Sequence, residues 1–186
     1  MPALDRSLIA GLRPFLALSS EELDEILSAA RSARYARDTE IFAQGAEATH
    51  FFLLLSGHIR VVQTSPEGHQ VVARYINEGE LFGIAVAMSL KAYPATVVAA
   101  VDCVALSWPN SVWPNIQTRF PGFANGVYQT IGSHLRDTQT RVMELSSAQV
   151  EQRVANAVLR LAKQSGRKPP KGSRSIFPLR GRRSPN

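Results

Sequence analysis

Histidine and cysteine are the residue types that most readily hold a metal ion, and this chain has four histidines and one cysteine. They are His50, His58, His69, His134 and Cys103. The histidines are scattered singly and none belongs to a His-x-His step, so their spacing does not predict a metal site. One cysteine cannot fill a four-cysteine zinc site or hold a conventional iron–sulfur cluster, so the sequence excludes both.

No group of serine, cysteine or carboxylate side chains has the spacing of a catalytic site, and the sequence therefore does not predict an enzyme. Cys103 lies in a predicted strand among Val101, Val104 and Leu106. Apolar neighbours favour a buried, unreactive thiol over a redox switch.

Charge is distributed unevenly along the chain, whose formal net charge is +6. Residues 163–186 hold eight basic residues and no acidic one, whereas the preceding residues carry 13 basic and 15 acidic ones. A basic segment of this kind either stays solvated or contacts phosphate groups, and both interpretations remain open. The candidate phosphate contacts are Lys168, Lys171, Arg174, Arg180, Arg182 and Arg183.

Length and composition are typical of a globular protein. With 186 residues, 45% of them hydrophobic, the chain is long enough for a full core in its larger part. A single cysteine is typical of a reducing compartment. No apolar run approaches the length that spans a bilayer, and the N-terminus lacks the pattern of a signal peptide. We therefore expect a cytoplasmic protein.

The first part of the chain, residues 1–110, has the pattern of a mainly β domain with helices at its start. Helical spacing over residues 4–16 and again after Ser19-Ser20-Glu21-Glu22 predicts two helices. From about residue 34 to 108, short β-rich runs alternate with glycine or polar turns, as in an antiparallel sandwich or small barrel. The predicted strands are Glu40–Phe42, Phe51–Leu55, His58–Gln63, Gln70–Ile76, Thr96–Ala100 and Cys103–Trp108.

A narrow apolar seam follows Pro121-Gly122 and recurs at intervals of three and four residues, which predicts a long helix. Such a seam packs either on its own domain or on a second copy of the chain. Its narrowness favours a homodimer helix, which we place with its hinge in residues 111–146. After Phe123, the seam consists of Val127, Ile131, Leu135, Thr138, Val142 and Leu145.

Two glycine motifs carry a resemblance to a known family. The first runs from Gly45 through Phe51–Leu55 to Gly57, where glycines suit turns with positive φ and the apolar run suits a strand buried on both faces. The second is Gly79-Glu80-Leu81-Phe82-Gly83. With the order of elements over roughly residues 15–165, these motifs resemble the Crp/Fnr family of bacterial transcription regulators. The resemblance implies a cyclic-nucleotide-binding-like double-stranded β-roll, or jelly roll, a long dimerisation helix and a winged helix-turn-helix.

The segment that would hold cyclic AMP departs from the pattern of that family. Ile84 stands where the resemblance implies a ribose-binding glutamate, Tyr93 where it implies a phosphate-binding arginine, and Pro94 where it implies a serine. A buried phosphate without a cation lacks its partner, and only Lys91 lies nearby as a replacement. We therefore expect that cyclic AMP is not the effector.

The expected effector pocket is apolar, and such a pocket suits haem or another apolar ligand. Any of the four histidines is then either an axial ligand or an ordinary structural residue, and His134 is expected on the exposed flank of the long helix. The pocket residues are predicted to be Phe82, Gly83, Ile84, Ala85, Tyr93, Ala95 and Thr96.

DNA is the partner that the resemblance implies. A helix predicted over Ala148–Gln164 fits the first helix of the DNA-binding domain, and Phe177-Pro178-Leu179 resembles the start of its next segment. The residues that follow do not match the recognition helix, as in a truncated or frame-shifted chain. Because base readout requires an element placed in the groove, we expect residues 147–186 to be an incomplete winged helix-turn-helix with a basic tail.

The predicted function is therefore that of the effector-sensing and homodimerising part of a Crp/Fnr-type transcription regulator, with an incomplete DNA-binding half. The alternative is a stand-alone module that binds a cyclic-nucleotide-like ligand or haem, dimerises, and modulates intact members of the family.

Overall fold

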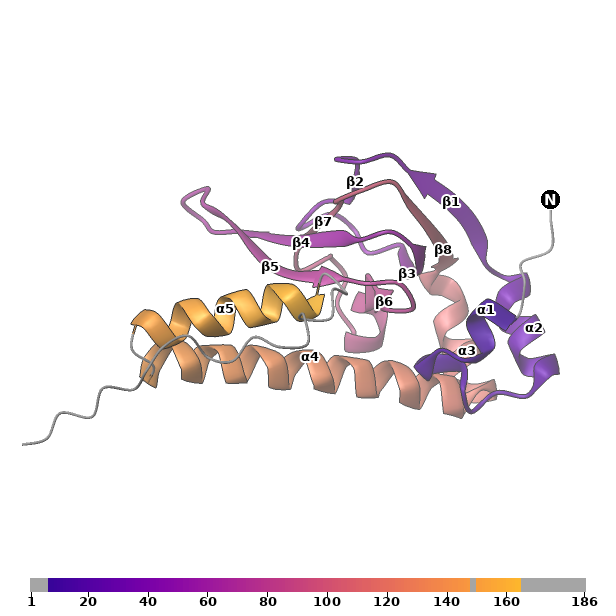
Figure 1. The fold of residues 1–186 in the computed structure, drawn as a ribbon. Coiled ribbons are helices and arrows are strands. Elements are labelled where there is room, and N and C mark those ends of the chain that lie inside the picture. Colours follow the sequence, from indigo (N-terminus) through magenta and orange to yellow (C-terminus); the bar gives the residue numbers. More distant parts are fainter. Residues whose placement is uncertain (1–6, 148–149, 165–186) are drawn as a thin grey trace, which may run out of the picture. The chain divides into compact units, whose positions relative to one another are not determined.

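The computed structural model of the chain describes residues 7–147 and 150–164 (Figure 1). The chain divides into two compact units near residue 148. The first unit contains the β-strands and the long helix α4 (Pro121–Ser147), and the second contains α5 (Val150–Gln164). None of the helices in the described part of the chain combines the length and the hydropathy that crossing a bilayer requires.

Two four-stranded antiparallel sheets form a β-roll, which confirms the predicted mainly β jelly-roll architecture. The strand order is β1-β8-β3-β6 in one sheet and β2-β7-β4-β5 in the other. Every predicted strand is present, with its ends displaced by at most one residue. The strands are β1 (Arg31–Tyr35), β2 (Glu40–Phe42), β3 (His50–Ser56), β4 (Ile59–Thr64), β5 (Gln70–Ile76), β6 (Leu81–Phe82), β7 (Thr96–Ala99) and β8 (Cys103–Pro109).

Strands β1 and β6 are present although the sequence does not predict them. β1 reads Arg-Ser-Ala-Arg-Tyr, which has no apolar alternation, and it forms by pairing with β8, so that Arg31 lies opposite Ser107. β6 is two residues long and pairs with β3. Both strands depend on partners far away in the sequence, and local periodicity does not record such partners.

Strand β3 lies at the centre of the core, which explains its run of five apolar residues. Successive side chains of a strand point to opposite faces of the sheet. Phe51 and Leu53 belong to one buried cluster, whereas Phe52 and Leu54 belong to another. Because both faces are covered, both sets of side chains must be apolar.

The N-terminal helices differ from the sequence expectation at one point. Instead of one helix over residues 4–16, the described part holds α1 (Ser7–Ala10) and the 3-10 turn η1 (Arg13–Phe15). Pro14 has no amide hydrogen to continue an α-helix. The next helix, α2 (Ser20–Ser28), begins as predicted with a capping box between Ser19 and Glu22.

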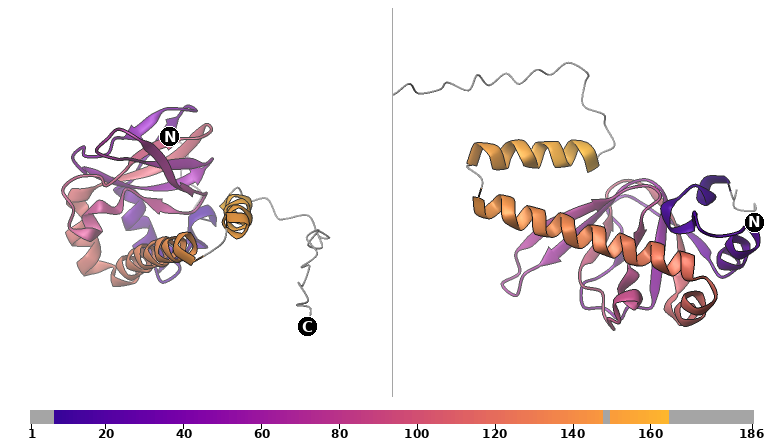
Figure 2. Two further views of the ribbon diagram at one scale, coloured as in Figure 1. Left: turned by 90° about the vertical axis from the view of Figure 1, so that its left-hand side faces the viewer. Right: turned by 90° about the horizontal axis from the view of Figure 1, so that it is seen from below.

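Helix α4 runs alongside the β-roll (Figure 2) and packs against the N-terminal segment. Phe123 and Val127 are fully buried in the same cluster as Phe15 of η1, and Ile131 packs against that cluster. The seam therefore packs on its own chain over its first half. Helix α4 follows η3 (Asn110–Val112) and α3 (Trp113–Arg119).

Beyond Ile131 the seam of α4 is open to solvent. Leu135 and Val142 are 59% and 57% exposed. Thr138, between them, is also exposed. Leu145 lies outside the residues whose side chains the structure describes, as do the six candidate phosphate contacts of the basic tail.

Candidate effector cavity

A cavity of ≈ 150 Å³ lies against the second sheet of the β-roll. Its walls come from all four strands of that sheet, from the segment that contains β6, the 3-10 turn η2 (Ile84–Met88) and residues 93–95, and from α4. Six of the seven residues predicted for the effector pocket line it, namely Phe82, Gly83, Ile84, Ala85, Tyr93 and Ala95. The seventh, Thr96, instead accepts the backbone N–H of Gln44 with Oγ1 at 2.9 Å.

The turn that enters η2 requires glycine at position 83. Gly83 has φ of 64°, in the left-handed region that disfavours residues with a Cβ atom. A Cβ there would also lie 2.9 Å from Cδ2 of Phe52. The close approach brings η2 onto the sheet, so that the buried side chains of Ile84 and Ala85 reach the cavity.

Tyr93 serves as a structural anchor in the cavity wall. Its ring stacks on Phe42 with a centroid distance of 3.8 Å. Its hydroxyl donates to the carbonyl oxygen of His50 at 2.7 Å and accepts from the N–H of His50 at 3.1 Å. The hydroxyl thus already has two partners in β3. The position where the family resemblance implies a cation is therefore held by a buried aromatic ring.

The cavity nevertheless has a cation, Arg74 of β5, which corrects the expectation that only Lys91 lies near enough. Lys91 is exposed and does not line the cavity. Nη2 of Arg74 lies 2.7 Å from Oε2 of Glu80. Burial lowers the pKa of the guanidinium, while the charges of Glu80 and Asp137 oppose that change.

A signal for Arg74 was present in the sequence. Alternate residues of a strand share a face, and Arg74 therefore lies on the same face of β5 as Ile76, which is buried. An arginine that shares a strand face with a core residue indicates a cation that points into the protein.

His134 of α4 also lines the cavity, so the expectation that it lies on the exposed flank of the helix is wrong. It is half-buried. Burial first, and the charge of Arg74 second, lower the pKa of His134 to about 4, with Asp137 opposing. His134 is therefore neutral at neutral pH and can exchange hydrogen bonds without adding a charge.

The other three histidines lie elsewhere. His50 places its Nδ1 atom 3.0 Å from Oγ1 of Thr49, His58 accepts a hydrogen bond from Cys103 with its carbonyl oxygen, and His69 is exposed beside β5.

The cavity does not fit a haem. Pockets for drug-sized ligands have volumes of roughly 300–1,000 Å³, and this cavity of ≈ 150 Å³ is smaller. Only His134 among the four histidines lines it. In the described part of the chain, no three His, Cys, Asp or Glu residues come together in a way that could hold a metal ion.

Cys103 is buried, which confirms the predicted environment of its thiol. Sγ donates to the carbonyl oxygens of Val101 at 3.1 Å and His58 at 3.3 Å, and burial raises the pKa of the thiol. The thiolate form that reacts is therefore disfavoured.

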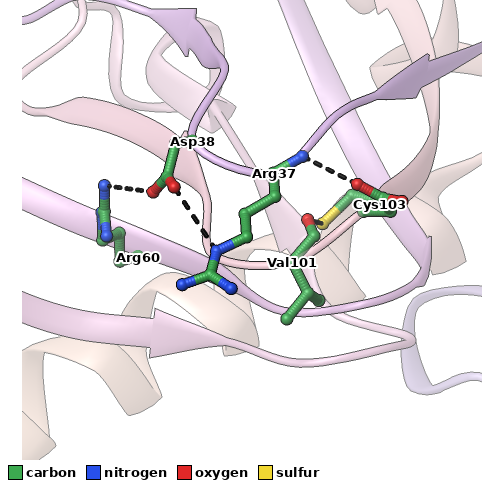
Figure 3. Close-up of polar contacts among 6 residues, drawn as sticks. Arg37, Asp38, Arg60, Val101 and Cys103 are labelled. Carbon is green, nitrogen blue, oxygen red and sulfur yellow. Dashed lines mark hydrogen bonds and ion pairs between the residues drawn. The ribbon is translucent and has the colours of Figure 1, made fainter.

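A charged cluster surrounds the turn between β1 and β2 near Cys103 (Figure 3). Asp38 has φ of 64° and accepts Nη2 of Arg60 at 2.9 Å, while Nε of Arg37 lies 3.4 Å from its other oxygen. The backbone N–H of Arg37 donates to Asp102 at 2.8 Å. These exposed contacts hold two turns together, and none of the four residues lines the cavity.

Comparison with known proteins finds similarity to a described domain over the roll. Residues 32–119 match the cyclic nucleotide-binding domain. The cyclic AMP receptor protein of Thermus thermophilus is 28% identical over 150 residues, which are 81% of this chain and 69% of that protein. The crystal structure of the Thermus thermophilus catabolite activator protein has a TM-score of 0.65 and 28% identity, covering 82% of this chain and 71% of that chain.

A shorter match involves an enzyme. Lysophospholipase nte1 of Aspergillus niger is 29% identical over 97 residues, which are 52% of this chain but only 6% of that protein.

Proposed function

We propose, from the premise that residues 32–119 are a cyclic nucleotide-binding domain with Crp/Fnr-like relatives, that this chain is the effector-sensing and dimerising part of a transcription regulator of that type. Several solved structures that cover three quarters of this chain or more are described as regulators, whereas the lysophospholipase matches over only 6% of its own length.

One observation carries the proposal. His134 of α4 lines the same cavity as Arg74 of β5 and Ile84 of η2. A ligand in the cavity would therefore contact both the sensor and the long helix. If the sensor and the helix move relative to each other, such a ligand binds the two arrangements with different affinities. A difference in affinity between two states is what a ligand needs in order to shift a conformational equilibrium.

The effector in this proposal is not cyclic AMP. Ile84 and Tyr93 supply neither a carboxylate for a ribose nor a cation for a phosphate. The one cation on the wall, Arg74, lies on β5 and not in the segment where the resemblance implies the phosphate-binding arginine. A phosphate placed as the resemblance implies would therefore be buried without a partner, which costs several kcal/mol and supports a different ligand class.

The exposed half of the seam on α4 supports dimerisation with a second copy. Leu135 and Val142 are seven residues apart and therefore share a helix face. Met143, beside them, is 71% exposed. Val127 and Ile131 pack on their own chain, so the proposed dimer contact begins after Ile131.

The proposed organisation keeps three parts. Residues 1–110 are the sensor, residues 111–146 are the dimerisation helix and hinge, and residues 147–186 belong to a DNA-binding half of a cytoplasmic protein. Helix α5 has the amphipathic pattern of a first helix in such a domain.

Sedimentation of the full chain tests the proposal, with Leu135→Asp as the variant and Thr140→Asp as its control on another face of α4. We expect a dimer that Leu135→Asp dissociates and Thr140→Asp leaves intact, because a charge at a dimer seam must be desolvated. A monomer at every concentration, or equal effects of both variants, contradicts dimerisation through α4. Co-purification with a full-length regulator would favour the alternative, a module that modulates intact family members.

A further inference from the structure

We propose that the cavity binds a small apolar carboxylic acid with one six-membered ring, whose carboxylate is held by Arg74. This inference rests on the proposed sensing role of the cavity and names the chemical class of its effector.

The volume of the cavity indicates the size of the group that fills it. A closed apolar cavity of about 150 Å³ accommodates one benzene ring, and the volume here is ≈ 150 Å³ in a cavity that is partly open to solvent. A single ring with one short substituent fills this volume.

The walls of the cavity suit an aromatic or cycloaliphatic ring. Phe42 is central to them, because its ring lies 3.8 Å from that of Tyr93 and 6.3 Å from that of Phe82 between centroids. All three residues line the cavity, together with Ile84 and Val97. Aromatic walls of this kind favour a flat apolar guest through offset or edge contacts.

Arg74 supplies the one full charge on the wall. Among the lining residues, Arg74 is the only one whose side chain is ionised at neutral pH, since the pKa of His134 is about 4. A charged ligand group that leaves water needs an opposite charge. The planar fork of a guanidinium matches the two oxygens of a carboxylate.

The pair with Glu80 leaves Arg74 able to bind a ligand. The hydrogen bond to Glu80 uses Nη2, whereas a guanidinium has five N–H donors. Glu80 does not line the cavity, and its side chain is 36% exposed. A ligand carboxylate would therefore approach Arg74 from the cavity. It would compete with Glu80 for the positive charge of Arg74. Neutral His134 would add a hydrogen bond to the ligand.

The test is calorimetric titration of the full chain with two probes of the same shape, sodium benzoate and benzyl alcohol. We expect Arg74→Gln to weaken benzoate binding about tenfold or more, because it removes charge-assisted hydrogen bonds. Binding of benzyl alcohol should not change. Glu80→Gln should leave benzoate binding unchanged or tighten it, because it removes the competing carboxylate.

Two controls keep the result interpretable. Arg34→Gln, on exposed β1, changes the net charge equally and should not affect benzoate. Arg74→Lys keeps the charge but loses the planar fork, so it should give an intermediate loss even if Arg74→Gln does not fold.

Equal binding of benzoate and benzyl alcohol, or no heat of binding with benzoate at millimolar concentration, would overturn the ligand class. The proposed function fails separately, by the absence of an α4 dimer in sedimentation. A protein that dimerises through α4 and binds cyclic AMP instead of benzoate would retain the sensing role and refute this inference.

Discussion

Arg74 and Glu80 form an ion pair, with Nη2 of the arginine 2.7 Å from Oε2 of the glutamate. Oε1 of Glu80 also accepts Nδ2 of Asn77 at 3.2 Å. The pair therefore braces the turn from β5 to β6 and positions the one arginine that lines the cavity. A ligand that binds Arg74 in the cavity would therefore compete with the contact that holds this turn.

Glu80→Gln should lower the free energy of unfolding by about 1 kcal/mol, because a partly buried arginine loses its charged partner. Urea denaturation at neutral pH measures this change. Glu40→Gln, on the exposed edge of β2, serves as the matched control and should have a smaller effect. Equal losses in the two variants would show that the pair does not brace the turn.

Tyr93→Phe should destabilise the roll by about 1–2 kcal/mol, because the carbonyl oxygen and the N–H of His50 both lose a partner while the stack on Phe42 remains. Thermal or urea unfolding measures the loss. Tyr75→Phe, half-buried on β5, is the control. A loss no greater than that of the control would contradict the anchoring role of the Tyr93 hydroxyl.

Alanine at two glycines of α4 should change stability in opposite directions. A Cβ at Gly126 would lie 2.8 Å from Cα of Pro14, so Gly126→Ala should cost about 1–3 kcal/mol through overpacking. A Cβ at Gly132 would have its nearest neighbour at 3.7 Å, the Nη1 atom of Arg136. Gly132→Ala should therefore stabilise by about 0.5–1 kcal/mol. Calorimetric melting compares the two, and the same sign in both would refute the close packing of η1 on α4.

His134 should make the protein less stable as the pH falls from about 6.5 to about 4. Its pKa is about 4 in the folded chain and 6.5 in the unfolded reference, so the unfolded state binds more protons in that window. The slope from this one group is at most about 1.4 kcal/mol per pH unit. His134→Gln should flatten the fall in urea midpoint between pH 7 and pH 4.5, whereas His69→Gln should not. An unchanged profile would show that His134 is not desolvated.

Six of the eight strands are predicted by the sequence, because each of the six has either two-residue alternation or an apolar run between turn residues. Gly45 and Gly57 both have positive φ, of 81° and 97°, as the turns around β3 require. β1 had no such pattern, because its charged and small residues form a strand only through pairing with β8. The helix over residues 4–16 was predicted too long because apolar spacing continued up to Pro14.

Most residues of the candidate site could be predicted because they are close together in the sequence. Phe82, Gly83, Ile84 and Ala85 are consecutive, and a local motif was enough to place them together. Arg74 and His134 were missed as wall residues, although the phase of Arg74 with Ile76 was available. No local signal joins His134 to the sheet, because its place depends on how α4 packs on the roll.

The sequence by itself determined the β-roll and the long helix after it, and it predicted a departure from the residues by which the family resemblance implies that a cyclic nucleotide is held. Only the tertiary structure decided that Arg74 and His134 line one cavity, and that the seam on α4 packs on its own chain up to Ile131 and is exposed from Leu135. The physical reason is that periodicity along a chain records which face of an element is apolar. It does not record which surface covers that face, because that depends on contacts between elements far apart in the sequence.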